Sequence, residues 1–289
     1  MEYNRLLLDH TVLRLVQIAL AEDIGVGDIT TEALVMEDAL AQATFIAKSP
    51  GVIAGRDIAS LAMTEVDPAL GCEWSVEDGD RVEKGSAIGQ VRGPAASILT
   101  AERTALNFLQ RMSGVATLTR RYVDSIAGTG ATMLDTRKTI PGWRILDKYA
   151  VAMGGGSNHR MGLWDMVMIK DNHIAAHGSI TGAVEAVRRY LSGRSGAAIP
   201  IEVETTTLEQ VREALSVEGV TRIMFDNASL EMMREGVAIV GGRCETEASG
   251  NVSLETVRGI AETGVQFISC GALTHSVAAL DISLEVRAL

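Results

Sequence analysis

The residues best suited to chemistry are concentrated between positions 135 and 173. Two polar blocks, Asp135-Thr136-Arg137-Lys138 and Lys170-Asp171-Asn172-His173, flank a glycine run that leads into Asn158-His159-Arg160. The chain as a whole is acidic, with 37 Asp and Glu against 26 Lys and Arg. Cations gathered against that background predict a binding site for a substrate with several negative charges.

The elements that must position these blocks form a regular alternation from residue 131 onward. Apolar runs predict strands at 131–134, 166–169, 199–203, 222–225, 243–248 and 265–269. The stretches between them predict helices at 141–152, 179–192, 207–216, 229–240 and 253–263, and Thr139 and Ser253 are the expected N-terminal caps of the first and last. This alternation predicts a mostly parallel sheet, either open or closed into a barrel.

Ligands of parallel sheets bind outside the carboxyl ends of the strands, so the residues after each apolar run are the candidate site residues. The first two runs end in cations, at Arg137 and Lys138 and at Lys170. The next two end in carboxylates, at Glu202 and Glu204 and at Asp226, and the fifth run also carries Glu247 at its end. The last two runs end in small residues, which are Ser249, Gly250 and Asn251 after one run and Cys270, Gly271 and Ala272 after the other.

This division of charge indicates which ligand groups the strand ends suit. Cations bind phosphate and carboxylate groups, and carboxylates beside a phosphate bind Mg²⁺ through oxygen. Gly250 and Gly271 allow backbone amides to approach a phosphate, just before helices whose N-termini favour anions. His159, beside Arg160 in a loop, is a candidate carboxylate ligand. The pattern predicts a phosphorylated, metal-chelated substrate.

The first part of the chain has a different pattern. Residues 9–22 predict a helix whose apolar face includes Leu13, Val16, Ile18 and Leu20. Residues 22–31 predict a loop in which Asp28 caps a turn. Residues 41–92 predict several short strands interrupted by a helix at 56–66, which together indicate an α+β module.

A helical region follows Pro94, and its expected apolar face consists of Leu99, Leu106, Leu109 and Met112. Arg103 lies among these residues. From the local sequence alone it pairs with Glu102 or Asn107 on a solvated face.

Composition argues against several classes of function. A pI near 5.0 argues against nucleic acid or an anionic membrane as the main partner, and no apolar run reaches the length of a membrane span. The N-terminal residues predict an amphipathic helix rather than a signal peptide. Three widely spaced cysteines without metal-binding spacing predict a reducing cytoplasm. The signature motifs of kinases, dinucleotide-binding dehydrogenases and α/β-hydrolases are absent from the sequence.

One hairpin motif gives an alternative. The stretch DGDRVEKGSAIGQV resembles the hairpins of biotinyl and lipoyl carriers, but Lys84 lacks the Met-Lys context of a modified lysine. A carrier function is therefore disfavoured.

Eight stretches of the chain together resemble the quinolinate phosphoribosyltransferases, also called carboxylating nicotinate-nucleotide diphosphorylases. They are EDIGVGDITT, AERTALNFLQRMSG, LDTRKTIPGWRILDKYAV, GGGSNHRMGLWDMVMIKDNHI, IEVE, MFDN, EASGNVSLETV and GALTHSVAALDISL. The DTRK, NHR and KDNH blocks are the most specific, and the resemblance runs from about residue 9 to residue 286.

The resemblance implies transfer of phosphoribose from phosphoribosyl pyrophosphate to quinolinate with Mg²⁺, giving nicotinate mononucleotide, pyrophosphate and CO₂. It implies an α/β fold with an N-terminal α+β sandwich domain, residues 1–113 joined by segment 276–289, and an incomplete, open α/β barrel at 114–275. It also implies a homodimer, or a higher oligomer built from it, in which Arg103 reaches the site of the other chain.

The resemblance also implies roles for the candidate residues. Quinolinate carboxylates would be held by Arg103, Arg137, His159, Arg160 and Lys170, and Thr136 would be a further substrate-binding residue. Lys138 and Lys170 would face the pyrophosphate, and Glu204 and Asp226 would hold Mg²⁺ and the ribose hydroxyls. The 5′-phosphate would lie against Ser249, Gly250, Gly271 and Ala272, and Asn251 and Cys270 would be further substrate-binding residues.

The sequence departs from the family pattern at Asn251, where the family usually has a second glycine. If that position needs a positive φ, Asn tolerates it better than most residues. Two alternatives stay open: a phosphoribosyltransferase-like enzyme of the kind found with molybdate transport, and a non-catalytic phosphosugar-binding protein. The intact Lys170-Asp171-Asn172-His173 block favours quinolinate over the first, and the retained Glu204 and Asp226 argue against the second.

Overall fold

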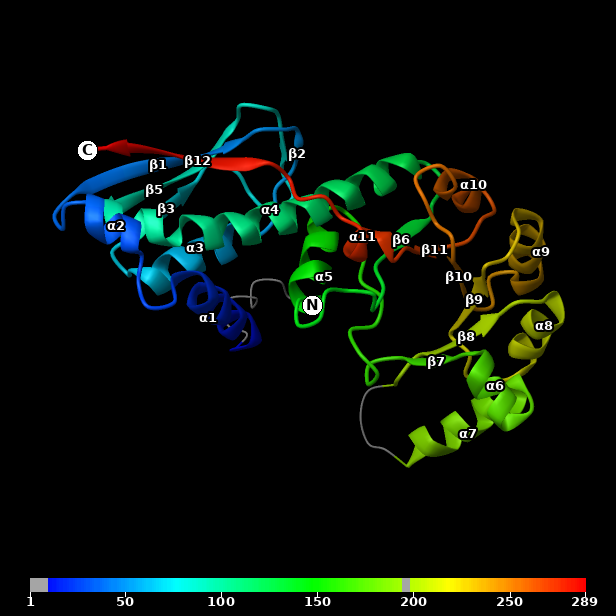
Figure 1. The fold of residues 1–289 in the computed structure, drawn as a ribbon. Helices are drawn as coiled ribbons and strands as arrows, with labels where there is room; N and C mark the ends of the chain where they lie inside the picture. Colours follow the sequence, from blue (N-terminus) through cyan, green and yellow to red (C-terminus); the bar gives the residue numbers. More distant parts are fainter. Residues whose placement is uncertain (1–9, 194–197) are drawn as a thin grey trace. The chain divides into compact units, whose positions relative to one another are not determined.

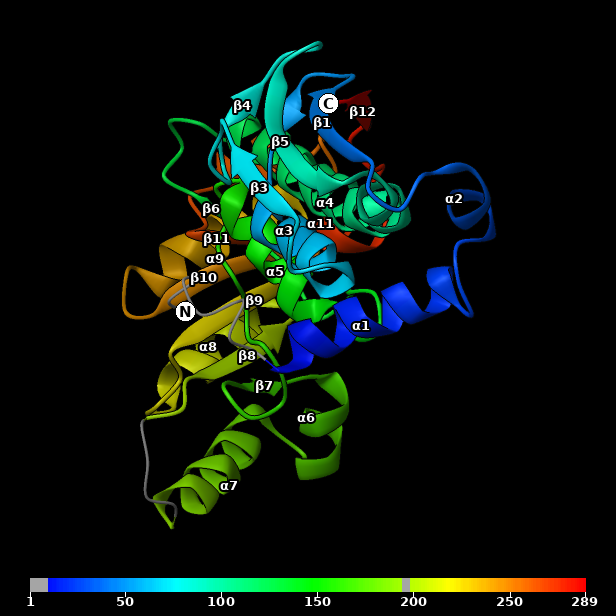
Figure 2. The ribbon, with the colours of Figure 1, turned by 90° about the vertical axis from the view of Figure 1, so that its left-hand side faces the viewer.

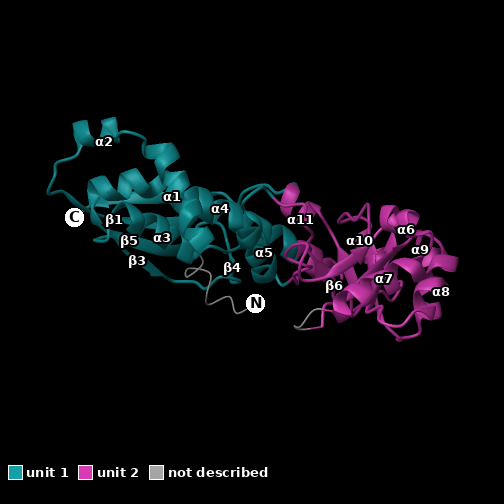
Figure 3. Cartoon of the chain, turned by 90° about the horizontal axis from the view of Figure 1, so that it is seen from below, with its two compact units in different colours: residues 1–120, 140–155, 276–289 teal, residues 121–139, 156–275 magenta. Residues whose placement is uncertain are grey.

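The computed structural model describes residues 10–193 and 198–289 of the chain. The chain divides into two compact units (Figure 3). Unit 1 contains residues 1–120, 140–155 and 276–289, and unit 2 contains residues 121–139 and 156–275. The long helix α4 (Ala95–Ser125) begins in unit 1 and ends with the first residues of unit 2. The domain boundary predicted between residues 113 and 114 stays a prediction.

Unit 1 is built on a four-stranded antiparallel sheet in the order β12-β1-β5-β3. Its strands are β1 (Leu40–Ala47), β3 (Gly71–Trp74), β5 (Ala87–Pro94) and β12 (Ile282–Ala288), and β2 (Gly51–Val52) pairs separately with β4 (Arg81–Val82). Alternate residues of β1 are buried because successive side chains point to opposite faces. Phe45 on the buried face stacks on Trp74, with ring centroids 4.9 Å apart. The period-two pattern thus predicted β1, β3 and β5 correctly, whereas β12 lies outside the stretch that it covered.

The other helices of unit 1 are α1 (His10–Ile24), α2 (Ile29–Leu34), α3 (Arg56–Val66) and α5 (Arg144–Met153). Two residues assigned to apolar faces are exposed instead, Ile18 on α1 and Leu99 on α4. Asp28 caps α2 by accepting the N–H of Thr31, so the predicted loop ends in a short helix.

Helix α5 begins three residues later than predicted, and Thr139 does not cap it. Its N-cap is Trp143, which follows a turn at Pro141 and Gly142. Gly142 has a φ of 83°, a left-handed conformation that interrupts a helix.

Unit 2 is built on a six-stranded sheet in the order β6-β11-β10-β9-β8-β7, and every pairing is parallel. Its strands are β6 (Thr132–Leu134), β7 (Val167–Ile169), β8 (Ile201–Thr205), β9 (Arg222–Asp226), β10 (Glu245–Ser249) and β11 (Phe267–Ser269). Within the described residues β6 and β7 remain the two edges, so the barrel is not closed. All six predicted strands are confirmed, and the open arrangement is the correct one.

The helices of unit 2 are α6 (Asp171–His177), α7 (Ile180–Ser192), α8 (Leu208–Ser216), α9 (Leu230–Val240), α10 (Val257–Ala261) and α11 (Ala272–His275). Helices α8 and α9 lie side by side against the outside of the strands, and α6 and α7 lie next to edge strand β7 (Figures 1 and 2). Helix α6 was not predicted, and α10 begins at Val257 rather than at Ser253. No helix in the described part of the chain is long and apolar enough to span a membrane.

Candidate active site

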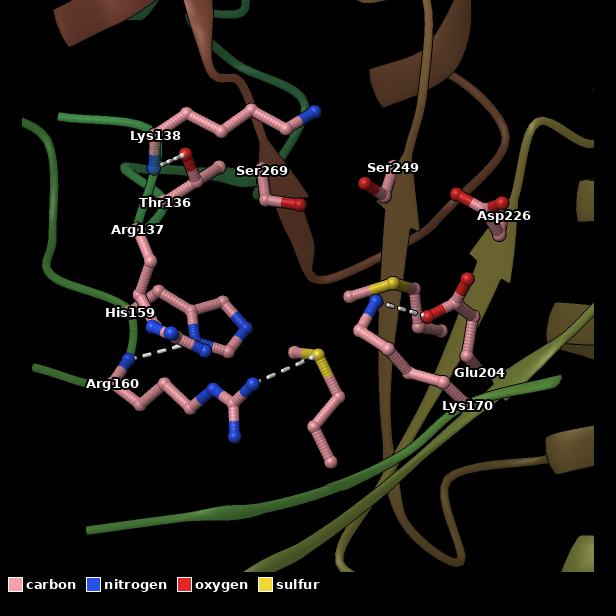
Figure 4. Close-up of a pocket in the computed structure, with 12 residues that line it drawn as sticks. Thr136, Arg137, Lys138, His159, Arg160, Lys170, Glu204, Asp226, Ser249 and Ser269 are labelled. Atoms are coloured by element: carbon pink, nitrogen blue, oxygen red, sulfur yellow. Dashed lines mark hydrogen bonds and ion pairs between the residues drawn. The ribbon is translucent and has the colours of Figure 1, made fainter. Parts of the chain in front are cut away.

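A pocket of about 210 Å³ lies in unit 2 where the parallel strands reach their carboxyl ends (Figure 4). It is lined by Thr136, Arg137, Lys138, His159, Arg160, Met168, Lys170, Glu204, Met224, Asp226, Ser249 and Ser269. All six strands of the sheet contribute a residue from their last positions or from the segment that follows. The structure therefore brings together most of the side chains that the strand-end argument selected.

Two levels of side chains point to this side of the sheet, because residues two apart along a strand share a face. The mouth layer consists of Lys170, Glu204, Asp226, Ser249 and Ser269. The floor layer consists of the residues two positions earlier, which are Met168, Glu202, Met224, Glu247 and Phe267. Met168 and Met224 reach the pocket, whereas Glu202 and Glu247 are fully buried. Glu202 and Glu247 thus lie one step below the mouth.

The mouth layer contains a short ion pair. Lys170 Nζ lies 2.6 Å from Glu204 Oε2, and the lysine side chain is 45 % exposed while that of Glu204 is 14 % exposed. On the neighbouring strand Asp226 accepts a hydrogen bond from Asn227 Nδ2 at 2.9 Å. These groups lie close to solvent, so a bound substrate can exchange contacts with them at little cost in desolvation.

The opposite wall of the pocket is cationic and comes from the segments after β6 and before β7 (Figure 4). Arg160 Nη1 donates to the carbonyl of Met166 at 3.1 Å, which fixes the guanidinium beside the pocket. Burial lowers the pKa of Arg160, and the nearby charge of Arg137 lowers it further. Two guanidinium groups held near each other favour a ligand with more than one carboxylate.

His159 joins this wall to the buried floor. Its Nε2 lies 3.1 Å from Glu202 Oε2 and 3.4 Å from Glu247 Oε2. Arg222 Nη1 donates to Glu247 at 2.9 Å, and its Nε and Nη2 donate to Glu245 at 2.9 and 2.8 Å. The floor is therefore a charge network inside the sheet, with an arginine below it and a histidine above it.

The pKa shifts of this network follow from burial and mutual attraction. Burial raises the pKa of Glu202, and the charge of Glu247 adds to that. Burial lowers the pKa of His159, but the attraction of Glu202 and Glu247 outweighs it and raises the pKa to about 9. The folded network therefore retains a proton at neutral pH.

A backbone contact decides which nitrogen of the His159 ring carries the proton. His159 Nδ1 accepts the backbone N–H of Arg160 at 2.7 Å, which requires a lone pair on that nitrogen. A fully protonated imidazole would place two N–H groups against each other there. We therefore assign the ring proton to Nε2, and the retained proton belongs to the coupled network of His159, Glu202 and Glu247.

His159, Glu202 and Glu247 offer ligand atoms within 4.8 Å of one another, which is close enough for a metal ion. Two contacts argue against one. Arg222 already occupies Glu247, and the proton on His159 is on Nε2, the atom that a metal would need. Glu204 and Asp226 fit Mg²⁺ better, because both carboxylates line the open pocket and come from neighbouring strands.

The glycine-bearing strand ends only partly match the predicted phosphate site. Ser249 and Ser269 line the pocket, but Gly250, Asn251, Cys270, Gly271 and Ala272 are not among its lining residues. Gly250 is not followed directly by a helix, because α10 begins only at Val257. A Cβ on Gly271 would lie 2.9 Å from Lys138 Cδ, so this glycine keeps the Lys138 side chain close to the strand end.

Asn251 adopts the left-handed conformation that the sequence allowed for, with a φ of 51°. Its Nδ2 donates to Asn227 Oδ1 at 3.0 Å, and Asn227 is itself left-handed with a φ of 50°. The departure from glycine at this position is therefore compatible with the backbone.

Arg103 is exposed on α4 within unit 1. The expected pairing with Glu102 is an electrostatic attraction, since burial raises the pKa of Glu102 and the charge of Arg103 lowers it.

Sequence reasoning missed Met168, Met224 and Ser269 as lining residues, and it missed the contact of Glu202 and Glu247 with His159. The signal was the period of two, because each of Met168, Glu202 and Met224 precedes a predicted site residue by two positions.

Two family models match the chain. Quinolinate phosphoribosyl transferase, N-terminal domain, matches residues 28–113, and Quinolinate phosphoribosyl transferase, C-terminal domain, matches residues 115–285. Together they cover most of the chain.

Curated relatives and solved structures agree with this match. The chain is 51 % identical over 286 residues to quinolinate phosphoribosyltransferase [decarboxylating] 1b of Nicotiana tabacum, covering 94 % of this chain and 81 % of that protein. It is 44 % identical to the probable nicotinate-nucleotide pyrophosphorylase [carboxylating] of Bacillus subtilis, covering 92 % and 90 %. The crystal structure of NadC from Streptococcus pyogenes superposes with a TM-score of 0.91 at 37 % identity, covering 96 % of each chain.

Proposed function

Because this chain belongs to the quinolinate phosphoribosyl transferase family, we propose that it transfers the phosphoribosyl group of phosphoribosyl pyrophosphate to quinolinate. The products are nicotinate mononucleotide, pyrophosphate and CO₂, and the reaction belongs to NAD biosynthesis. The chain is thus a pentosyltransferase, a carboxylating nicotinate-nucleotide pyrophosphorylase in the naming of its relatives.

The division of charge across the pocket carries this proposal. Arg137, Lys138 and Arg160 line one side, and Glu204 and Asp226 line the other (Figure 4). Quinolinate has two adjacent carboxylates, which suit the two guanidinium groups held near each other. The ribose carbon that reacts develops positive charge, which suits the carboxylates.

The side chains of the mouth can support each charge that develops. Loss of pyrophosphate leaves positive charge on the ribose, which Glu204 and Asp226 stabilise, while Lys138 and Lys170 stabilise the leaving group. Glu204 and Asp226 would hold Mg²⁺ together with the substrate phosphates, and the ion would neutralise further charge on the pyrophosphate. When CO₂ leaves the new nucleotide, the positively charged pyridinium takes up the electron pair, so the chain needs only to orient the reactants.

Further parts of the assignment extend the proposal. The 5′-phosphate lies against Ser249 and the backbone of Gly250 and Gly271. The chain acts as a homodimer in which Arg103 of the partner subunit completes the carboxylate site. A reducing compartment, the cytoplasm, is consistent with three free cysteines.

The dimer proposal can be tested with two variants that are each inactive. Arg103→Ala and Lys170→Ala subunits, mixed and allowed to exchange, should recover part of the activity, because hybrid dimers contain one intact site. No recovery after confirmed subunit exchange would contradict a shared site.

A coupled assay tests the reaction. The purified chain is supplied with phosphoribosyl pyrophosphate, Mg²⁺ and either quinolinate or nicotinate, and nicotinate mononucleotide and CO₂ are followed. Product from quinolinate alone is expected, because two carboxylates are needed to engage the cationic wall. No product, with phosphoribosyl pyrophosphate still bound, would keep the phosphate site but require a different acceptor, as in the enzymes found with molybdate transport.

A further inference from the structure

A short segment before β7 carries His159 and Arg160 and is attached to the edge of the parallel sheet at Ser157. Ser157 forms a parallel bridge with Leu134, so the segment extends the sheet beyond β6. The N–H of His159 then donates to Asp135 Oδ1 at 2.9 Å, and Asp135 is fully buried. The backbone that presents the cationic wall is therefore fixed from below.

The imidazole of His159 is fixed at both nitrogens. On one side Nδ1 accepts the backbone N–H of Arg160, and on the other Nε2 faces the floor carboxylates, 3.1 Å from Glu202. Nε2 lies at similar distances from Glu202 and Glu247, so both carboxylates attract its proton. The ring thus connects the buried floor to the backbone of Arg160.

We propose that Glu202, acting through His159 and assisted by Glu247, is a positioning residue for Arg160 in the carboxylate-binding wall. The Glu202 carboxyl lies 3.1 Å from Nε2 and favours the proton on that nitrogen, which leaves the Nδ1 lone pair to hold the Arg160 N–H. That hydrogen bond fixes the backbone of Arg160 and therefore the starting position of its side chain. The inference rests on the proposed function in one respect, namely that the wall binds the carboxylates of quinolinate.

This arrangement differs from one in which His159 is a cationic ligand of the substrate. A cationic ligand needs a protonated nitrogen directed at the carboxylate, but both nitrogens already face protein groups. A positioning role needs only a hydrogen-bond acceptor below Nε2. The two roles therefore make different demands on Glu202: the first needs its charge, and the second needs its oxygen.

Substitutions at Glu202 separate these demands. Glu202→Met removes the acceptor while keeping the length of the side chain, whereas Glu202→Gln keeps an acceptor without a charge. We expect Glu202→Met to weaken quinolinate binding about tenfold or more, the effect of losing a hydrogen bond that orients a charged group. Glu202→Gln should restore most of that affinity. Calorimetric titration with quinolinate provides the measurement, and affinity for phosphoribosyl pyrophosphate should stay unchanged in both variants.

Glu245→Met is the matched control. Glu245 lies on β10 and binds the same Arg222, but it is half exposed and is not in contact with His159 in the described structure. Its substitution should leave quinolinate affinity at the wild-type value. Equal loss in Glu202→Met and Glu245→Met would overturn the proposal, because the effect would then come from Arg222. Equal loss in Glu202→Met and Glu202→Gln would also overturn it, because charge would then be the requirement.

Nitrogen NMR of ¹⁵N-histidine-labelled protein gives an independent measurement that needs no substrate. The His159 signals, identified by their loss in His159→Asn, should show a neutral ring with the proton on Nε2 in the wild type and in Glu202→Gln. Glu202→Met should lose that preference. A doubly protonated ring in the wild type would overturn the proposal. If the wild type binds no quinolinate, the proposed function fails, and the NMR result still decides the positioning role.

Discussion

The mouth and floor layers of the parallel sheet lie on the same strands, two residues apart, yet they treat charge in opposite ways. In the mouth, Lys170 and Glu204 form a pair beside solvent, with the lysine 45 % exposed. In the floor, Glu202 and Glu247 are fully buried and are held by His159 and Arg222. The charges of the mouth are accessible to a ligand, whereas the charges of the floor pair with other side chains inside the protein.

The difference teaches how a pocket rich in cations is kept in shape. Exposed ion pairs contribute little to stability, so the mouth cannot hold its own geometry by charge. Buried charges must be paired, because an unpaired buried charge is strongly destabilising, so the floor is restricted to one arrangement. His159 contacts the floor and also accepts the backbone N–H of Arg160, so the fixed floor also fixes the position of that backbone. Substitutions should therefore affect stability in the floor and binding in the mouth.

The largest effect is expected from Glu247→Leu in the floor. This change leaves the Arg222 guanidinium buried without its closest interior carboxylate. We expect the free energy of unfolding to fall by about 3–5 kcal/mol, the usual result of removing one partner of a buried pair. Urea unfolding measures it. Glu245→Leu, which removes the half-exposed partner of the same arginine, should cost no more than about 1 kcal/mol. Equal losses in the two variants would erase the distinction between the layers.

A slightly smaller effect is expected from pH. The floor network holds one proton tightly, which raises the pKa of His159 within it to about 9, against about 6.5 for an ordinary histidine. A raised pKa means that the folded state holds the proton more tightly, so this stabilisation is complete below about pH 6.5 and is lost as the pH rises through about 9. The raised pKa contributes at most about 3 kcal/mol to the free energy of unfolding.

Unfolding curves between pH 6 and 10 measure this loss, with His159→Asn as the control. The difference in unfolding free energy between wild type and His159→Asn should shrink as the pH rises. A difference that stays constant across the range would show that the floor does not retain the proton.

Much of the fold was predictable because each strand of the parallel sheet is a short apolar run between polar segments, as at Arg222–Asp226. Helix α6 was missed because it buries none of its residues and therefore lacks an apolar period. The start of α5 was misplaced because Pro141 suggested a first turn, whereas Gly142 in a left-handed conformation ends that turn before Arg144. The local sequence predicts that a helix or strand forms more reliably than it predicts where that element begins and ends.

The candidate site was predictable at the mouth and not at the floor. Lys170 and Asp226 follow apolar runs directly, and a charge at that position has an evident function. Glu202 lies inside an apolar run, where the sequence shows an acidic residue but not its partner. That partner, His159, comes from a segment more than forty positions earlier, so only the folded chain reveals the contact. Contacts between side chains so far apart in the sequence form only in the tertiary structure.

A third prediction concerns the mouth alone. Arg137 is exposed at the pocket, so Arg137→Ala should change the free energy of unfolding by no more than about 1 kcal/mol. Quinolinate binding should weaken by about 1.5–3 kcal/mol, the contribution of a hydrogen bond to a charged group. Calorimetric titration measures the affinity, and phosphoribosyl pyrophosphate provides the control ligand, whose affinity should not change. Unchanged quinolinate affinity would remove Arg137 from the carboxylate site.

The smallest effect is expected at the rim of the mouth, where Asn251 is left-handed. Asn251→Ala should lower the free energy of unfolding by about 1 kcal/mol, because a Cβ without a compensating polar group is disfavoured at positive φ. Asn251→Gly relieves that conformation but loses the exposed hydrogen bond to Asn227, so the two contributions should nearly cancel. Urea unfolding of the pair isolates the backbone contribution. If Ala and Gly are equally stable at this position, the left-handed conformation is not what selects asparagine, and the contact with Asn227 is the remaining reason for its presence beside the pocket.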